Sequence, residues 1–171
     1  MVKVKKNFSF KKAASLIQGN VADSLNLMAV YQNEAIQRGI ATSTDIEGKP
    51  FKRLSTESTL PIRNKRGQGF TPLDRMKGER QKKLRNTKVI KATKAKLISK
   101  IQMLTSYGVY HNQKGGFKVQ NNFMKKEKHV PQRNWFGISK EMRKGGKQYE
   151  KYARMTLFKI QKSLANFNAN T

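Results

Sequence analysis

The chain contains no cysteine and only two histidines among its 171 residues. The lack of cysteine excludes disulfide bonds, thiolate zinc sites and thiol nucleophiles. No stretch approaches the ~18 consecutive apolar residues that a membrane-spanning helix needs. The basic start, residues 1–6, is not followed by an apolar segment, so we expect no secretory signal. These absences fit a protein that folds in a cytosol.

Acidic residues are also scarce. The chain has 10 Asp and Glu against 37 Lys and Arg, which gives a formal net charge of +27. Residues 1–48 carry a net charge of +2, residues 49–100 carry +14 and residues 101–171 carry +11. Because a field this positive attracts polyanions, the candidate partners are nucleic acid, an acidic protein surface and anionic lipid. The composition fits equally well with Lys-rich stretches that are simply solvated.

The shortage of acids argues against catalysis. Carboxylate acid–base chemistry needs two acids in one cleft, and the closest pair, Asp45 and Glu47, lies in turn-forming sequence. His111, Asn112 and His129 suggest a metal nuclease, but too few acids are nearby to complete a metal site. No phosphate-binding loop or dinucleotide fingerprint is present. We therefore expect no enzyme activity, no metal and no cofactor.

Two helices are predicted from the spacing of apolar residues. Steps of three and four run through residues 9–38 and again through residues 147–166. Ser9 is placed to cap the start of the first helix, and Gly39 is placed to end it in a left-handed conformation. Both helices carry an apolar stripe of the kind that packs on a core.

The sequence between the helices predicts a small sheet and a long loop. Residues 40–88 have turn chemistry and many cations, which is typical of an extended basic arm that orders only on assembly. Alternating residues predict one half-buried strand over 89–104, and short strand or turn pieces at 107–110 and 116–119 complete an antiparallel meander. We therefore expect a single α+β domain over residues 1–171, with a long N-terminal helix and a C-terminal helix packed on a small antiparallel β-sheet.

Three segments, taken together, resemble one protein family. Residues 48–59 have the sequence GKPFKRLSTEST, residues 107–116 have YGVYHNQKGG, and residues 130–139 have VPQRNWFGIS. They are similar to the patterns G-x-P-W-x-P-L-S-x-x-T, Y-A-x-x-H-Q-x-G-G and I-P-A-R-P-F-L-G-L-S. These patterns belong to the phage virion morphogenesis proteins, the tail completion family of Mu-like and related tailed phages. The order between the two helices is also that of the family.

The resemblance has departures, among them a basic insert at residues 63–88 that is longer than the family leads us to expect. Phe51 stands where the family has Trp, and Arg53 stands where it has its second Pro. Thr59 comes one place late, and Asn112 is an extra residue between the family's His and Gln.

The resemblance implies a structural virion protein without enzyme activity. It implies a neck or tail completion subunit, found in the virion and in the host cytoplasm during assembly. Such a subunit forms a homo-oligomeric ring, for which we expect a hexamer, and joins the head connector to the tail. The implied partners are portal and adaptor proteins and the tail tube protein, with DNA passing through the channel.

Two interpretations of the matched residues remain open. Pro131 fixes φ and Gly137 permits a close approach, so residues 131–137 form a preset loop. In one interpretation this loop and its neighbours dock a subunit or partner; the predicted interface residues are Arg133, Trp135, Phe136, Tyr110 and His111. In the other, the aromatic pair fills the core beneath the last helix, and the tyrosine and histidine shape a hairpin turn. We favour the core for Phe136, while Arg133 fits both.

The most basic part of the chain, residues 63–100, is predicted to meet acidic partners or DNA. The predicted contact residues are Arg63, Lys65, Arg66, Arg75, Lys77, Arg80, Lys82, Lys83 and Arg85. The rival function is a basic nucleic-acid-binding protein of ribosomal or nucleoid type, for which charge alone is the argument. We expect no membrane partner, because the polar face of the first helix is nearly neutral.

Overall fold

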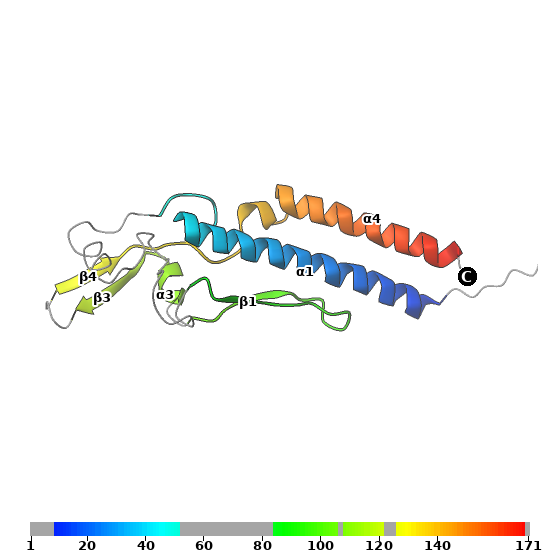
Figure 1. The fold of residues 1–171 in the computed structure, drawn as a ribbon, viewed down its shortest axis with the longest axis horizontal. Coiled ribbons are helices and arrows are strands. Elements are labelled where there is room, and N and C mark those ends of the chain that lie inside the picture. The colour runs from blue at the N-terminus through cyan, green and yellow to red at the C-terminus, as the bar shows by residue number, and fades with distance from the viewer. Residues whose placement is uncertain (1–8, 52–83, 106–107, 122–125, 170–171) are drawn as a thin grey trace, which may run out of the picture. The chain divides into compact units, whose positions relative to one another are not determined.

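The structure of the chain is a computed structural model that describes residues 9–51, 84–105, 108–121 and 126–169 (Figure 1). The elements in chain order are α1 (Phe10–Thr42), β1 (Thr87–Ile90), β2 (Lys100–Met103), α3 (Gly108–Asn112), β3 (Phe117–Asn121), β4 (Lys126–Val130), the 3₁₀ turn η2 (Lys140–Met142) and α4 (Lys147–Ala169). The predicted α+β class is confirmed: the chain has a long N-terminal helix, a C-terminal helix and a small two-stranded antiparallel sheet.

The described chain divides into two compact units, and each unit is discontinuous in sequence. The first takes its described residues from segments 1–31, 89–100 and 141–171. The second takes them from segments 32–88 and 101–140. Helix α1 therefore contributes its first two thirds to one unit and its last third to the other.

Helix α1 begins where the sequence predicts and ends later. The Lys12 N–H lies 3.5 Å from the Ser9 hydroxyl, which caps the first turn. The predicted end at Gly39 is wrong, because the helix continues to Thr42 and the left-handed residue is Ser43, with φ of 59°. The Thr44 N–H donates to the Gly39 carbonyl at 2.9 Å, which closes a Schellman-type turn.

In the first unit, α4 runs alongside α1 (Figure 1). The Thr156 hydroxyl lies 2.6 Å from the Ser24 hydroxyl, and the rings of Tyr31 and Tyr152 meet edge to face with centroids 6.2 Å apart. The predicted C-terminal helix is thus confirmed, and its inward face packs through polar and aromatic contacts.

The predicted single strand over residues 89–104 is wrong, because it is a ribbon of two strands, β1 and β2. The chain reverses between Thr93 and Lys96, whose backbones exchange hydrogen bonds of 2.9 and 3.0 Å. This turn contains no Gly or Pro to mark it in the sequence. The Asn26 side chain of α1 holds the ribbon at Ala92, accepting from its N–H at 2.7 Å and donating to its carbonyl at 3.1 Å.

The second unit contains the hairpin of β3 and β4, which pair antiparallel from Phe117 opposite Val130 to Asn121 opposite Lys126. The strand predicted at 116–119 is confirmed as β3. The strand piece predicted at 107–110 is wrong, because α3 begins at Gly108. The two ladders are separate two-stranded sheets, so the expected meander is also wrong.

Only the two ends of the predicted basic arm, residues 40–88, belong to the described chain. Residues 40–42 complete α1, and residues 87–88 begin β1. A tight turn follows α1, where the Asp45 carboxylate accepts from the Glu47 N–H at 2.9 Å and from the Lys49 N–H at 2.8 Å. Residues 52–83 lie outside the described residues.

Replacing Gly19 with Ala is expected to stabilise the protein. Gly19 lies inside α1, where Gly costs roughly 0.5–1 kcal/mol relative to Ala. An added Cβ would meet only the flexible end of Lys94, with Cε at 3.1 Å. Chemical denaturation should therefore show a free energy of unfolding that is higher by about 0.5 kcal/mol or more.

Gly39→Ala is the matched control in the same helix. Its added Cβ would lie 2.9 Å from the backbone carbonyl oxygen of Thr44, which cannot move away as a side chain can. The two variants should shift the free energy of unfolding in opposite directions. Equal shifts would contradict the packing described around both glycines.

Candidate functional site

The three segments that carry the family resemblance meet in the second unit, as far as they are described. Phe51 from the first segment and Trp135 from the third belong to one buried cluster. The Trp135 indole N–H donates to the carbonyl of Gly108, in the second segment, at 3.2 Å. Phe51 and Trp135, which are 84 positions apart in the sequence, thus share one packed site.

Trp135 is the centre of this site and is only 1% exposed. The buried cluster consists of Ile36, Ile40, Phe51, Leu84 and Trp135, with Ile101, Met103 and Phe136 packed against it. Gly108 allows this close packing, because a Cβ there would lie 2.1 Å from the Met103 sulfur and 2.8 Å from the Trp135 ring. The Gly of the YGVY sequence is therefore required by the core.

Two side-chain amides hold the irregular backbone that carries Trp135. The Asn112 amide accepts from the N–H groups of Trp135 at 3.1 Å and Phe136 at 3.3 Å, and it donates to the Phe136 carbonyl at 2.7 Å. Buried backbone polar groups need partners when no helix or strand supplies them. Asn112 supplies three of these contacts from the end of α3.

Gln32 of α1 is the second amide and is buried. It donates to the Gly137 carbonyl at 3.0 Å and accepts from the Ser139 N–H at 3.2 Å and from the Ser139 hydroxyl at 3.0 Å. We call Asn112 and Gln32 the amide clamp. Together they bind consecutive stretches of the segment from Trp135 to Ser139.

Backbone hydrogen bonds join the same segment to its neighbours. The Arg133 N–H donates to the His111 carbonyl at 2.7 Å, and the Ile46 N–H donates to the Asn134 carbonyl at 2.9 Å. Residues 133–139 are therefore bonded to α1, to the turn that follows it and to α3. The segment is a fixed internal part of the second unit.

The five residues predicted as a partner interface have different positions. Arg133 and Trp135 are buried, and Phe136 packs half-buried on the cluster, so the pair belongs to a core. Its predicted place beneath the last helix is wrong, because the cluster includes residues of α1 and none of α4. His111 is half-buried, while Tyr110 is 56% exposed and follows Val109, which is 61% exposed. The partner role of these residues stays a prediction, and Tyr110 has the most surface with which to fulfil it.

Sequence reasoning missed both members of the amide clamp. From the sequence, Asn112 is identified as an extra residue within the family pattern and as a companion of the two histidines, but not as a partner of this backbone; its place inside a matched segment is a usable signal. Gln32 had no such signal, because it lies among other polar residues of α1, more than 100 residues before the backbone it binds.

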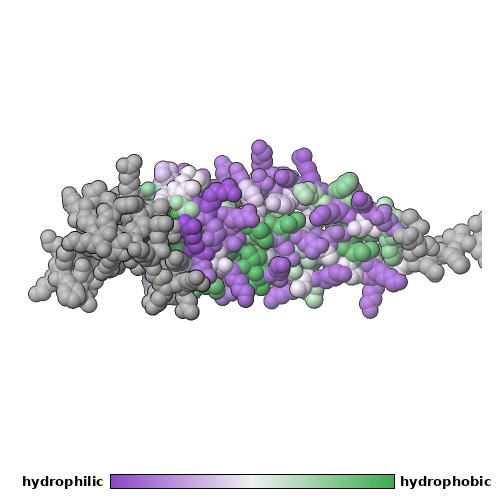
Figure 2. Space-filling model, in the orientation of Figure 1, coloured by the Kyte–Doolittle hydropathy of each residue, from purple (hydrophilic) through white to green (hydrophobic). Residues whose placement is uncertain are grey.

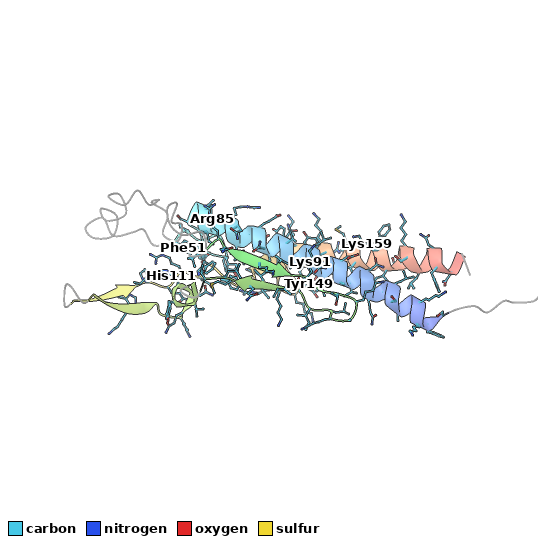
Figure 3. The ribbon with its side chains drawn as sticks, turned by 60° about the horizontal axis from the view of Figure 1, so that its bottom comes forward. Phe51, Arg85, Lys91, His111, Tyr149 and Lys159 are labelled. Atoms are coloured by element: carbon cyan, nitrogen blue, oxygen red, sulfur yellow. The ribbon has the colours of Figure 1, made fainter. Side chains whose placement is uncertain are left out.

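Of the predicted anion-contact residues, only Arg85 is among those the structure describes, and it is exposed (Figure 3). The others lie outside the described residues. The ribbon that follows carries five more exposed lysines: Lys88, Lys91, Lys94, Lys96 and Lys100. Because no acidic residue occurs between residues 85 and 105, this ribbon is uniformly basic.

Among the described residues, no three His, Asp or Glu side chains are grouped so that they could hold a metal ion. His129 lies with Nε2 2.9 Å from the Gly115 carbonyl oxygen, a contact that ties the β3–β4 hairpin together. None of the helices in this part of the chain has the length and apolar character needed to cross a membrane.

The first unit buries fewer large apolar residues than the second. Among its described residues, the buried apolar ones are Ala13, Ala22, Ala92 and Met142. Its exposed large apolar residues are Phe10, Leu16, Ile17, Leu27, Val30, Ile90, Leu97, Ile98, Met155, Leu157 and Phe158. Figure 2 shows hydrophobic side chains reaching the surface among hydrophilic ones. Exposed apolar area of this extent is typical of an interaction surface.

Comparison with known proteins identified no relative: no family model, no curated protein and no solved structure matches the chain.

Asn112→Ala is expected to destabilise the second unit. The change removes the side-chain partner of the Phe136 N–H and carbonyl, and one of two acceptors of the Trp135 N–H, which also donates to the Arg133 carbonyl at 2.8 Å. Each group left unsatisfied costs about 1–3 kcal/mol when it is buried. We expect the free energy of unfolding to fall by roughly 2 kcal/mol in a denaturant titration. Gln113→Ala is the control, because its neighbouring side chain is exposed. Similar losses in both variants would mean that the clamp has no special role.

Proposed function

We propose that the chain is a structural protein of a tailed-phage virion. In this proposal it is a neck or tail completion subunit that forms a homo-oligomeric ring and joins the head connector to the tail tube. The observation that carries the proposal is the meeting of the family-like segments around Trp135. Residues that are similar to a family pattern and far apart in sequence are expected to lie together when they define a common fold.

The surface of the first unit supports a subunit role. Among the described residues of this unit, eleven large apolar side chains are exposed, and the buried apolar residues are three alanines and one methionine. In the assembled neck, neighbouring virion proteins would cover such exposed apolar residues. The scarcity of acids supports the absence of enzyme activity in the same proposal.

The basic ribbon gives the proposed ring an electrostatic partner. Its exposed lysines, together with Arg85, would attract acidic surfaces of portal-side or tail proteins, or the DNA that passes through the channel. Such attraction is weakened by salt, because mobile ions screen exposed charges within about 10 Å at 0.1 M.

Electron microscopy of the purified protein tests the proposal. We expect closed rings in negative stain, because a neck subunit is built to surround the channel. Virions of the phage that encodes the chain should contain the protein, at the junction of head and tail. A monomer at every protein concentration, together with a virion proteome that lacks the chain, would end the proposal.

The uniformly basic ribbon favours a second candidate, a nucleic-acid-binding protein. A two-stranded ribbon fits the major groove of DNA, and exposed lysines bind phosphates by releasing counterions. We expect gel-shift affinity for duplex DNA to fall steeply from low to moderate salt. Absence of binding even at ~0.05 M salt would set this candidate aside, because the electrostatic contribution is largest there.

A further inference from the structure

The outer face of α4 carries a stripe of cations and apolar residues. We call this the α4 stripe; it consists of Lys151, Arg154, Met155, Phe158 and Lys162. Spacings of three and four place these residues on one side of a helix. All five are exposed, with Phe158 at 66% and Met155 at 41%.

The opposite face of α4 is already occupied. Tyr152 packs on Tyr31, and the Ser163 hydroxyl accepts from the Asn20 amide at 3.1 Å. Thr156 bonds to Ser24 on the same side. The helix is therefore anchored through this face, and the α4 stripe points away from the first unit.

Charge argues against a second copy of the chain as the occupant of the stripe. The described residues of the first unit include 13 Lys and Arg but only Asp23, Glu141 and Glu150 as acids. Two such surfaces repel one another, because like charges raise the free energy of association. An occupant must instead bring negative charge to Lys151, Arg154 and Lys162.

The apolar residues of the stripe distinguish between three kinds of negatively charged partner: nucleic acid, anionic lipid and an acidic protein helix. Met155 and Phe158 gain little from a phosphate backbone, which offers no apolar side chains to cover them. A membrane-surface helix uses its main apolar face for lipid, but on α4 that face is used by the contacts of Tyr152 and Thr156. An acidic amphipathic helix supplies carboxylates and apolar side chains at the spacing of the stripe.

We propose that the α4 stripe docks an acidic amphipathic helix of a protein partner. Carboxylates of the partner pair with Lys151, Arg154 and Lys162, and its apolar stripe covers Met155 and Phe158. This inference goes beyond the virion role and does not depend on it, because it is argued from the exposed face of one helix.

The test measures binding of a fluorescent synthetic peptide to the full chain by anisotropy. The peptide carries Glu and Leu at helical spacing, so that an acidic face flanks an apolar stripe, and a scrambled peptide of the same composition is the reference. We expect the first peptide to bind more tightly than the scrambled one. Phe158→Ala should weaken binding about tenfold, as for an aromatic anchor at an interface.

Leu157→Ala is the matched control. Leu157 is 61% exposed and adjacent in sequence, but it projects about 100° around the helix from Phe158. Its change should leave the affinity unaltered. Arg154→Gln should weaken binding and reduce its salt dependence, whereas Lys144→Gln, exposed and outside the helix, should do neither. Circular dichroism of each variant checks that helix content is retained.

Several results would overturn the inference. These are no binding of the amphipathic peptide, equal binding of the scrambled peptide, or equal losses in Phe158→Ala and Leu157→Ala. Phosphatidylglycerol vesicles and a random-sequence DNA duplex are tested in parallel. If the vesicles or the duplex bind with higher affinity than the peptide, and Phe158→Ala weakens that binding, the stripe is assigned to lipid or to nucleic acid instead.

Discussion

The second unit depends on satisfying the backbone of an irregular segment. Residues 133–139 are in neither a helix nor a strand, although they carry the tryptophan at the centre of the core. Their N–H and C=O groups cannot be left without partners inside a protein. The amide clamp meets this need from two elements, α3 and α1, so that the indole is placed by polar contacts made around it. Core packing and backbone hydrogen bonding thus fix the same few residues.

Different contacts stabilise the interior of each unit. In the second, one large aromatic residue is enclosed by branched side chains and by a glycine that leaves it room. In the first, small residues bring the elements close, and polar contacts such as Asn26 on Ala92 and Thr156 on Ser24 set their alignment. The first unit therefore gains less from apolar burial, since this gain is roughly proportional to the area removed from water. Its large side chains remain at the surface, where a partner would add to its stability.

The sequence predicted both helices and the α+β class because helical periodicity persists over many turns. It misplaced the end of α1, since Ser43 takes the left-handed conformation that Gly39 was expected to take. It missed the reversal at Thr93–Lys96 for a similar reason, because no glycine or proline marks that turn. The sequence singled out the segment around Trp135 through the family resemblance, but it did not show whether the side chains of this segment face the core or a partner. A loop with two aromatic residues and one Arg has the same composition whether it faces a core or a partner. Asn112 and Gln32 acquire their role only once distant segments meet.

The pairing of α1 with α4 affects how the protein is made. Ser24 bonds to Thr156, which is 132 residues later in the chain. At ~5–20 residues per second, a ribosome needs on the order of ten seconds to add that stretch. During this interval the apolar side of the first helix lacks its eventual neighbour. The first helix can therefore bury this side only after the last helix has been synthesised. Until then, aggregation competes with folding.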